Sequence, residues 1–219
     1  GGTIVRDAAT GEPAGVLKDN AMVLVDRVVP PPSPEMSDRA LDAAMRYVAE
    51  RGVTTVHNMG TWDDLATFER AHRAGRLVTR IYAAVPLATW ERLRDTIAAH
   101  GGSRGDAWLR VGGLKGFVDG SLGSHTAAML APFTDAPNDT GLFVNAPEDL
   151  YRWTKGADGA GLQVIVHAIG DRAIRTQLDV FERVERENGA RDRRFRIEHA
   201  QHVAPADIPR FAALHVIAS

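Results

Sequence analysis

The feature that most constrains this sequence is a regular alternation of strand-like and helix-like segments from residue 53 to residue 219. Short aliphatic runs, typical of strands buried on both faces, alternate with longer segments whose apolar residues recur at helical spacing. Strict alternation predicts a parallel sheet with right-handed crossovers. We expect strands at 53–57, 78–85, 109–118, 162–166, 195–198 and from 215, and helices at 62–74, 90–100, 147–158, 172–187 and 205–214.

Six sequential units with short links suit a closed barrel or a doubly wound sheet. No G-x-G-x-x-G motif follows an early strand, which disfavours a dinucleotide-binding sheet. A (β/α)8 TIM barrel needs eight strands, so two are missing from the expected set. The sequence therefore predicts an α/β fold in which a TIM barrel is incomplete.

The segment before the repeats reads as irregular. Residues 1–35 hold a turn at 10–13 and a proline cluster at 30–34, and are expected to form a lobe ahead of the barrel. Residues 36–219 are expected to form the partial barrel, with a long loop at 119–145. Ser37 and Asp38 are the expected caps of a helix that reaches Glu50 and ends at Gly52. Both chain ends look cut, so we expect an interior part of a longer protein.

Composition excludes several classes of function. The net charge is −2 and no basic run occurs, which gives no support to nucleic-acid or membrane-surface binding. There is no cysteine, so any metal must be held by histidine, carboxylate or a modified side chain. No apolar run approaches the roughly 20 residues that span a bilayer. We expect no membrane partner and a cytoplasmic location.

Two histidines follow buried strand patterns at the point where each strand should end. His167 ends the run LQVIVH, and His199 ends RIEH one strand-helix unit later. The carboxyl ends of parallel strands are where loops converge and where barrel enzymes place their chemistry. Alone, either residue would be read as a satisfied core histidine. The second histidine in the equivalent position favours a shared site.

Lys115 interrupts the apolar, glycine-rich strand pattern GGLKGFV. An ammonium group is unfavourable in such a strand unless it is paired or neutral. One interpretation is that Lys115 extends outward or pairs with Asp119. The functional alternative is a neutral amine that reacts with carbon dioxide to form a carbamate, an anionic ligand for two metal ions. A weaker alternative is a Schiff-base amine.

Several motifs resemble one family. LKGFVDGSLGSHTA, VIVHAIGDRA and RIEHAQH, with GVTTVHNMG and TGEPAGVLKDNA, resemble the amidohydrolase superfamily, and within it the metal-dependent hydrolase family 3 of YtcJ-like enzymes and N-substituted formamide deformylases. The resemblance covers nearly the whole chain. It implies a (β/α)8 barrel with one or two divalent metals, zinc being the one expected, and hydrolysis of amide-like C–N bonds in a small-molecule substrate.

Carried over by motif, the resemblance makes Lys115 the strand-4 lysine, carboxylated in many members, and His167 and His199 the metal ligands of strands 5 and 6. The chain would then hold about strands 2 to 7. The family's H-x-H pair of strand 1 and its general-base aspartate of strand 8 do not occur, so no catalytic residue is assigned. We expect the chain alone to be inactive, because it lacks the general base and because general acid–base catalysis typically raises the reaction rate by about 10²–10⁴-fold.

Other polar residues near the strand ends are candidates for substrate contact. Asp119, Ser121 and Ser124 follow Lys115, although Asp-Gly-Ser is also common turn chemistry. His57 is expected to end the strand at 53–57. We expect His125 to be an exposed loop residue and Asp171 to cap a helix. Gln201 and His202 are read as ligand contacts or solvent-facing residues, and structural roles are expected for His72, His100 and His215.

A second hypothesis is a catalytically incomplete scaffold. Unpaired strands at the edges of an open barrel favour pairing with another copy, so a homo-oligomer is expected.

Overall fold

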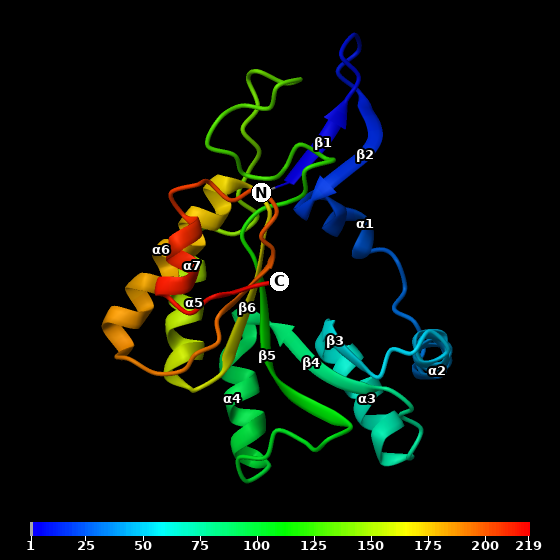
Figure 1. Cartoon of the computed structure of the whole chain (residues 1–219). Helices are drawn as coiled ribbons and strands as arrows, with labels where there is room; N and C mark the ends of the chain where they lie inside the picture. Colours follow the sequence, from blue (N-terminus) through cyan, green and yellow to red (C-terminus); the bar gives the residue numbers. More distant parts are fainter. Residues whose placement is uncertain (1) are drawn as a thin grey trace. The chain divides into compact units, whose positions relative to one another are not determined.

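The computed structural model describes residues 2–219, and its elements alternate as predicted (Figure 1). A β1–β2 hairpin comes first, and the strand-helix repeat follows it. The elements are β1 Gly2–Arg6, β2 Pro13–Asp19, a 3-10 turn at Asn20–Met22, α1 Val23–Asp26, α2 Pro34–Ala49, β3 Thr55–Met59, α3 Trp62–Arg73, β4 Arg80–Pro86, a 3-10 turn at Leu87–Thr89, α4 Trp90–Ala99, β5 Leu109–Phe117, α5 Pro147–Gly159, β6 Gln163–Ala168, α6 Asp171–Asn188, β7 Arg196–His199, α7 Ile208–Ala213 and β8 Ile217–Ala218.

The strands follow one another in the sheet in the same order as in the sequence. The order is β3-β4-β5-β6-β7-β8, and β1 and β2 form a separate antiparallel pair. The pairs β3–β4, β4–β5, β6–β7 and β7–β8 are parallel. Sequential parallel strands joined by helices are the arrangement of a (β/α) barrel. The predicted fold class, an incomplete TIM barrel, is confirmed.

By its internal contacts the chain divides into two compact units. One unit holds residues 31–115 and 156–164, with α2, α3, α4, β3, β4 and most of β5. Its core includes Leu65, Phe68, Ile81, Leu93 and Leu114, all under 10% exposed. Helix α3 begins at a capping box, in which Thr61 Oγ1 accepts from the Asp64 amide and the Asp64 carboxylate accepts from the Thr61 amide.

The other unit holds residues 2–30, 116–155 and 165–219. Helix α6 buries one apolar face, with Ile174 and Leu178 fully buried. Its Phe181 stacks on Phe195, with ring centroids 4.2 Å apart and planes 14° from parallel. This packing positions α6 beside the start of β7, and so fixes the two strands that carry the predicted histidines.

The start of α2 differs from the prediction. The cap is Ser33, whose Oγ accepts from the Met36 amide, and the helix begins at Pro34. Proline is favoured in the first turn because its missing N–H has no partner there anyway. Asp38, which was expected to cap, instead accepts hydrogen bonds from Arg70 and Arg76.

Two other boundaries also move. Strand β6 continues through His167 and Ala168, because these residues pair with Glu198 and His199. Strand β3 continues to Met59, since Asn58 and Met59 pair with Ala83 and Ala84. His57 therefore lies in the middle of β3 and not at its end, which corrects the prediction.

The segments expected to be irregular are partly ordered. Residues 2–30 contain the β1–β2 hairpin and α1, whereas residues 119–145 form no helix or extended strand. Lys18 Nζ donates to the Ser124 carbonyl at 2.6 Å, and Asn20 Nδ2 donates to the Val144 carbonyl at 3.4 Å, which ties the hairpin to the loop. The domain division at residue 35 stays a prediction. In the described chain, no helix combines the length and the apolarity that a membrane crossing needs.

Candidate metal centre

Two of the three predicted ligands come together at paired strands. Ala168 and His199 are register partners of β6 and β7, and His167 precedes Ala168. The imidazole rings of His167 and His199 lie edge to face, with centroids 4.6 Å apart and planes at 73°. The structure therefore brings two imidazole rings into contact within the unit of residues 2–30, 116–155 and 165–219.

A hydrogen bond fixes the tautomer of His167. Its Nε2 lies 2.7 Å from the Gly120 carbonyl oxygen. A carbonyl only accepts, so Nε2 carries the hydrogen and Nδ1 carries the lone pair. Metal-binding histidines commonly donate their other ring N–H to a carbonyl or carboxylate in this way. His167 is thus oriented as a ligand through Nδ1.

The Asp119 carboxylate is buried beside this histidine and accepts three hydrogen bonds from backbone amides. Its oxygens accept from the amides of Ala128 at 2.9 Å, Ile169 at 3.0 Å and Gly170 at 2.8 Å. Burial raises the pKa of Asp119, and the three amides oppose that rise. Asp119 therefore joins three backbone segments around His167, and its expected contact with substrate stays a prediction.

Glycine is required at two positions of this cluster. A Cβ on Gly120 would lie 2.0 Å from Thr126 Oγ1, and one on Gly170 would lie 2.0 Å from the Ala128 carbonyl oxygen. Gly170 is also the N-cap of α6, which corrects the prediction that Asp171 caps it. Asp171 is the first helical residue, and its Oδ1 accepts from the Leu130 amide at 2.7 Å.

The backbone at the end of β7 is strained. His199 has φ 76° and Ala200 has φ 41°, and both lie in the left-handed region that side chains with a Cβ rarely adopt. Such residues cost of the order of 1–3 kcal/mol each and cluster at functional sites. The amide of His199 donates to the Ser219 carbonyl at 2.7 Å, which holds this turn.

The two candidate serines bond to one another within the loop. Ser121 Oγ lies 2.7 Å from Ser124 Oγ, and Ser124 Oγ lies 2.7 Å from Thr126 Oγ1. His125, which was expected to be an exposed loop residue, is held by neighbours and is only partly exposed. Its ring stacks on Phe133 at 4.6 Å, and its Nε2 lies 3.2 Å from Asp135.

The residues after β7 are linked to the same cluster. The His202 amide donates to the Ile169 carbonyl at 3.0 Å, and Ile169 also donates to Asp119. Gln201 is exposed. The backbone of His202 is therefore part of the loop network, and a ligand contact by its ring stays a prediction.

Lys115 and His57 belong to the unit of residues 31–115 and 156–164. Lys115 is a register partner of Pro86, and only 6% of its surface is exposed. His57 is exposed, and its ring lies 5.1 Å from the Tyr82 ring. Burial of Lys115 agrees with a role inside the fold, whereas His57 contacts a neighbouring aromatic side chain.

Two adjoining imidazoles are the nitrogen donors that this unit offers to a divalent metal. Within residues 2–219, no group of three or more histidine and carboxylate side chains is arranged to hold a metal. The two adjacent imidazoles supply nitrogen donors of the type that zinc prefers, and the third predicted ligand, Lys115, is a different chemical type. Gly120 could not be recognised from the sequence as a partner of His167, because that contact is made by a backbone oxygen.

Comparisons with known proteins show the family of this chain. The family model described as Amidohydrolase family matches residues 1–219. The chain is 44% identical over 230 residues to Protein LONG AFTER FAR-RED 3 of Arabidopsis thaliana, covering 100% of this chain and 39% of that protein. It is 33% identical over 225 residues to Putative amidohydrolase YtcJ of Bacillus subtilis (strain 168), covering 99% of this chain and 40% of that protein.

Solved structures give the same relationship. An uncharacterized metal-dependent hydrolase from Pyrococcus furiosus matches with a TM-score of 0.79 and 28% identity, over 97% of this chain and 43% of that one. A second, from Pyrococcus horikoshii OT3, has a TM-score of 0.77 and 29% identity, over 98% and 43%. The chain spans about two fifths of the length of the curated relatives that it matches.

Proposed function

Because this chain belongs to the amidohydrolase family, we propose that it supplies the metal-binding part of a hydrolase that cleaves amide-like C–N bonds in small molecules. The observation that carries the proposal is the pair of edge-to-face imidazoles on β6 and β7, one of them oriented by the Gly120 carbonyl. The metal-dependent hydrolases among the similar structures support a hydrolytic reaction.

Three residues are proposed to hold the metal: His167, His199 and Lys115. Lys115 would do so as a carbamate, in which its neutral amine forms an N–C bond with carbon dioxide and releases one proton to solvent. Burial supports this role because it disfavours the ammonium form of a lysine.

When bound, a divalent metal at such a site supplies Lewis acidity that activates water and polarises a carbonyl group. The chain's own contribution is orientation. The Gly120 carbonyl accepts the hydrogen bond from Nε2 of His167 and so orients the ring. The Asp119 carboxylate accepts the amides of Ile169 and Gly170, and so connects the loop that contains Gly120 to the loop that follows β6. Ser121, Ser124, Asp119 and His57 are proposed to lie near substrate. We propose that turnover also requires segments beyond these 219 residues.

Metal content tests this proposal. Protein purified without chelator should contain zinc, and added zinc should raise the melting temperature. The variant with both His167→Ala and His199→Ala should lose both effects, whereas His100→Ala should keep them, since His100 is exposed on another unit. Zinc retention by the double variant would refute the ligand assignment. A carbamate signal in ¹³C NMR after incubation with labelled bicarbonate, absent from Lys115→Ala, would test the modified lysine.

A second candidate is a self-associating scaffold. Strand β3 lies at one edge of the sheet, and beside it an apolar cavity of about 500 Å³ is lined by residues of α2 and the strands, among them Leu41, Met45, Val56 and Ile81. Open edges favour association. Light scattering distinguishes the two outcomes, because a stable monomer that binds zinc supports the metal site and argues against the proposed homo-oligomer. A cytoplasmic location is proposed with either function.

A further inference from the structure

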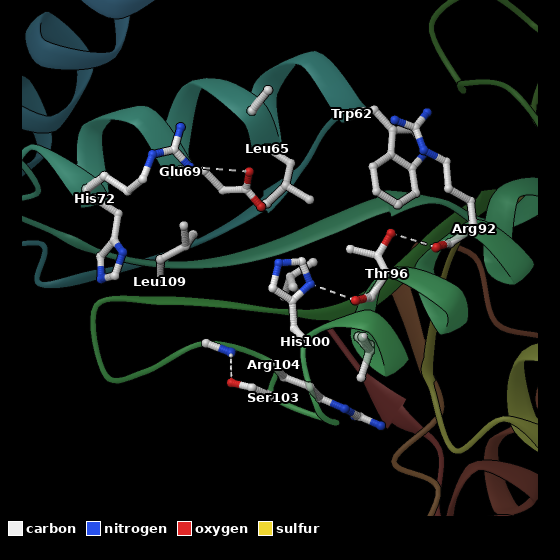
Figure 2. A pocket seen from close by; sticks show the side chains of 15 residues that line it. Trp62, Leu65, Glu69, His72, Arg92, Thr96, His100, Ser103, Arg104 and Leu109 are labelled. Atoms are coloured by element: carbon white, nitrogen blue, oxygen red, sulfur yellow. Dashed lines mark hydrogen bonds and ion pairs between the residues drawn. The ribbon is translucent and has the colours of Figure 1, made fainter.

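A second pocket lies in the unit of residues 31–115 and 156–164, and none of the proposed metal or substrate residues lines it (Figure 2). Its volume is about 540 Å³, within the range of small-molecule sites. It is formed by α3, α4, the loop after α4 and the start of β5. Because it shares no residue with the proposed metal centre, its role is independent of the hydrolase proposal.

The charged groups around this pocket are mainly cationic. Three arginines, Arg73, Arg92 and Arg104, line it against one carboxylate, Glu69, which gives a formal charge of +2 with neutral histidines. Glu69 lies 4.0 Å from Arg73. The pocket therefore favours an anion and disfavours a metal cation or a basic group.

Two of these guanidinium groups have no carboxylate partner among residues 2–219. Arg92 lies over the Trp62 ring, with Cζ 3.9 Å from the ring centroid. Arg104 donates from Nη2 to the Gly161 carbonyl at 2.8 Å, which holds the side chain in place and leaves other N–H donors of its fork. Both arginines are thus positioned by contacts that do not neutralise their charge.

Part of the pocket wall is apolar. Leu65 and Leu109 are buried beneath it, and Ile97 and Val111 are partly buried. Figure 2 shows Trp62 and Arg92 together at one end, and Arg104 and Ser103 on the loop below His100. His100 Nδ1 lies 2.7 Å from the Thr96 carbonyl, so Nδ1 donates and Nε2 is the other polar atom of the ring. A ligand here meets an apolar surface with cationic groups at its rim.

We propose that this pocket binds a small organic anion, with a carboxylate or phosphate head held by Arg92 or Arg104 at the rim and an apolar body packed on Leu65, Ile97 and Leu109. Arginine suits this role because its planar fork matches both carboxylate and phosphate geometry. Structural roles were predicted for His72 and His100, and no sequence motif marks this site. His72 keeps such a role here, since its Nε2 lies 2.9 Å from Asp106.

Calorimetry on the whole chain tests the proposal with phenyl phosphate and phenylacetate as probes. At least one should bind, and Arg92→Ala or Arg104→Ala should weaken that binding by about tenfold or more, because one of the two removes the charge-assisted contact. Arg94→Ala is the matched control, because Arg94 lies on the same helix but pairs with Asp95 outside the pocket. Inorganic phosphate and phenol, which each carry half of the ligand chemistry, should bind at least about tenfold more weakly.

Three results would overturn the proposal: no binding of either probe at millimolar concentration, equal binding of inorganic phosphate, or equal loss in Arg94→Ala. Arg104→Lys separates loss of binding from misfolding, because it keeps the positive charge but removes the planar fork of the guanidinium group. Weaker binding by this variant, with an unchanged melting curve, supports the assignment. The better of the two probes identifies the head group. Binding that persists in the variant lacking His167 and His199 shows that this site is separate from the metal centre.

Discussion

The Asp119 carboxylate lies 3.5 Å from Nε2 of His167, yet the hydrogen on that nitrogen points to the neighbouring Gly120 carbonyl at 2.7 Å. The carboxylate instead accepts the amides of Ala128, Ile169 and Gly170. The buried Asp119 side chain therefore has a structural role, because it accepts hydrogen bonds from the loops around the proposed metal ligand His167. Its replacement should therefore affect folding before it affects chemistry.

Asp119→Asn should lower the free energy of unfolding by about 1–3 kcal/mol. An amide has one acceptor oxygen, so its NH2 group would face a buried backbone N–H and leave that donor unsatisfied. Urea denaturation measures the loss. Asp95→Asn, an exposed control paired with Arg94, should leave stability nearly unchanged. Equal stability of Asp119→Asn and the parent chain would show that the three amides do not depend on the carboxylate.

Gly120→Ala should destabilise the chain by about 1–3 kcal/mol and weaken zinc binding. The new Cβ would lie 2.0 Å from Thr126 Oγ1 and 2.7 Å from Asp19 Oδ1, so the backbone that holds the His167 hydrogen must shift. Gly123→Ala is a matched control in the same loop, because a Cβ there meets no atom within 4 Å. Zinc titration and urea denaturation of both variants provide the test, and identical behaviour of the two would contradict it.

Ala200→Gly should raise the free energy of unfolding by up to about 1 kcal/mol. Its φ of 41° is unfavourable for a residue with a Cβ, and relief of that strain outweighs the extra freedom of glycine in the unfolded chain. Ala206→Gly, in an exposed position outside the left-handed region, should lower stability instead. A loss of stability in Ala200→Gly would mean that the turn after His199 is not strained.

Glu187→Gln should lower the melting temperature near neutral pH but not at strongly acidic pH. Hydrogen bonds from Lys155 Nζ at 2.6 Å and Tyr151 Oη at 2.5 Å lower the pKa of Glu187 from 4.5 to about 2. The folded-state pKa is depressed, so this contribution is fully present above pH 4.5 and is lost as the pH falls through about 2. Melting curves from pH 2 to pH 7 should show the two proteins converging at the acidic end. Glu185→Gln, on the same helix, should show no such convergence.

The order of elements could be predicted because each buried strand leaves a short aliphatic run in the sequence. The run from Leu162 to Val166 identified β6, and the helix expected from residue 62 matched the start of α3. Strand ends were predicted less well. His57 was placed at the end of β3, although pairing of Asn58 and Met59 with β4 extends the strand, and such pairing cannot be read from one segment alone.

The residues that surround the predicted ligands could not be predicted from the sequence, for a different reason. Gly120 and Ala128 act through backbone atoms, which every residue type possesses, so no side-chain pattern marks them. His125 was expected to be exposed, but Phe133 and Asp135, which hold it, come together only when the loop folds back. Residue types suggested His167 as a ligand, and only the folded backbone shows that the Gly120 carbonyl orients its ring.

The hydrogen bond from the Ala128 amide to the Asp119 carboxylate joins the two ends of a turn at residues 119–128, the first part of the 119–145 loop. The chain then leaves this closed turn, and the three residues from Leu130 to Pro132 are exposed. Side-chain exchanges at these three exposed positions leave the backbone hydrogen bonds of the inner turn in place. Descendants of one ancestral barrel could thus vary this outer stretch while the inner turn preserved the geometry of the imidazole pair.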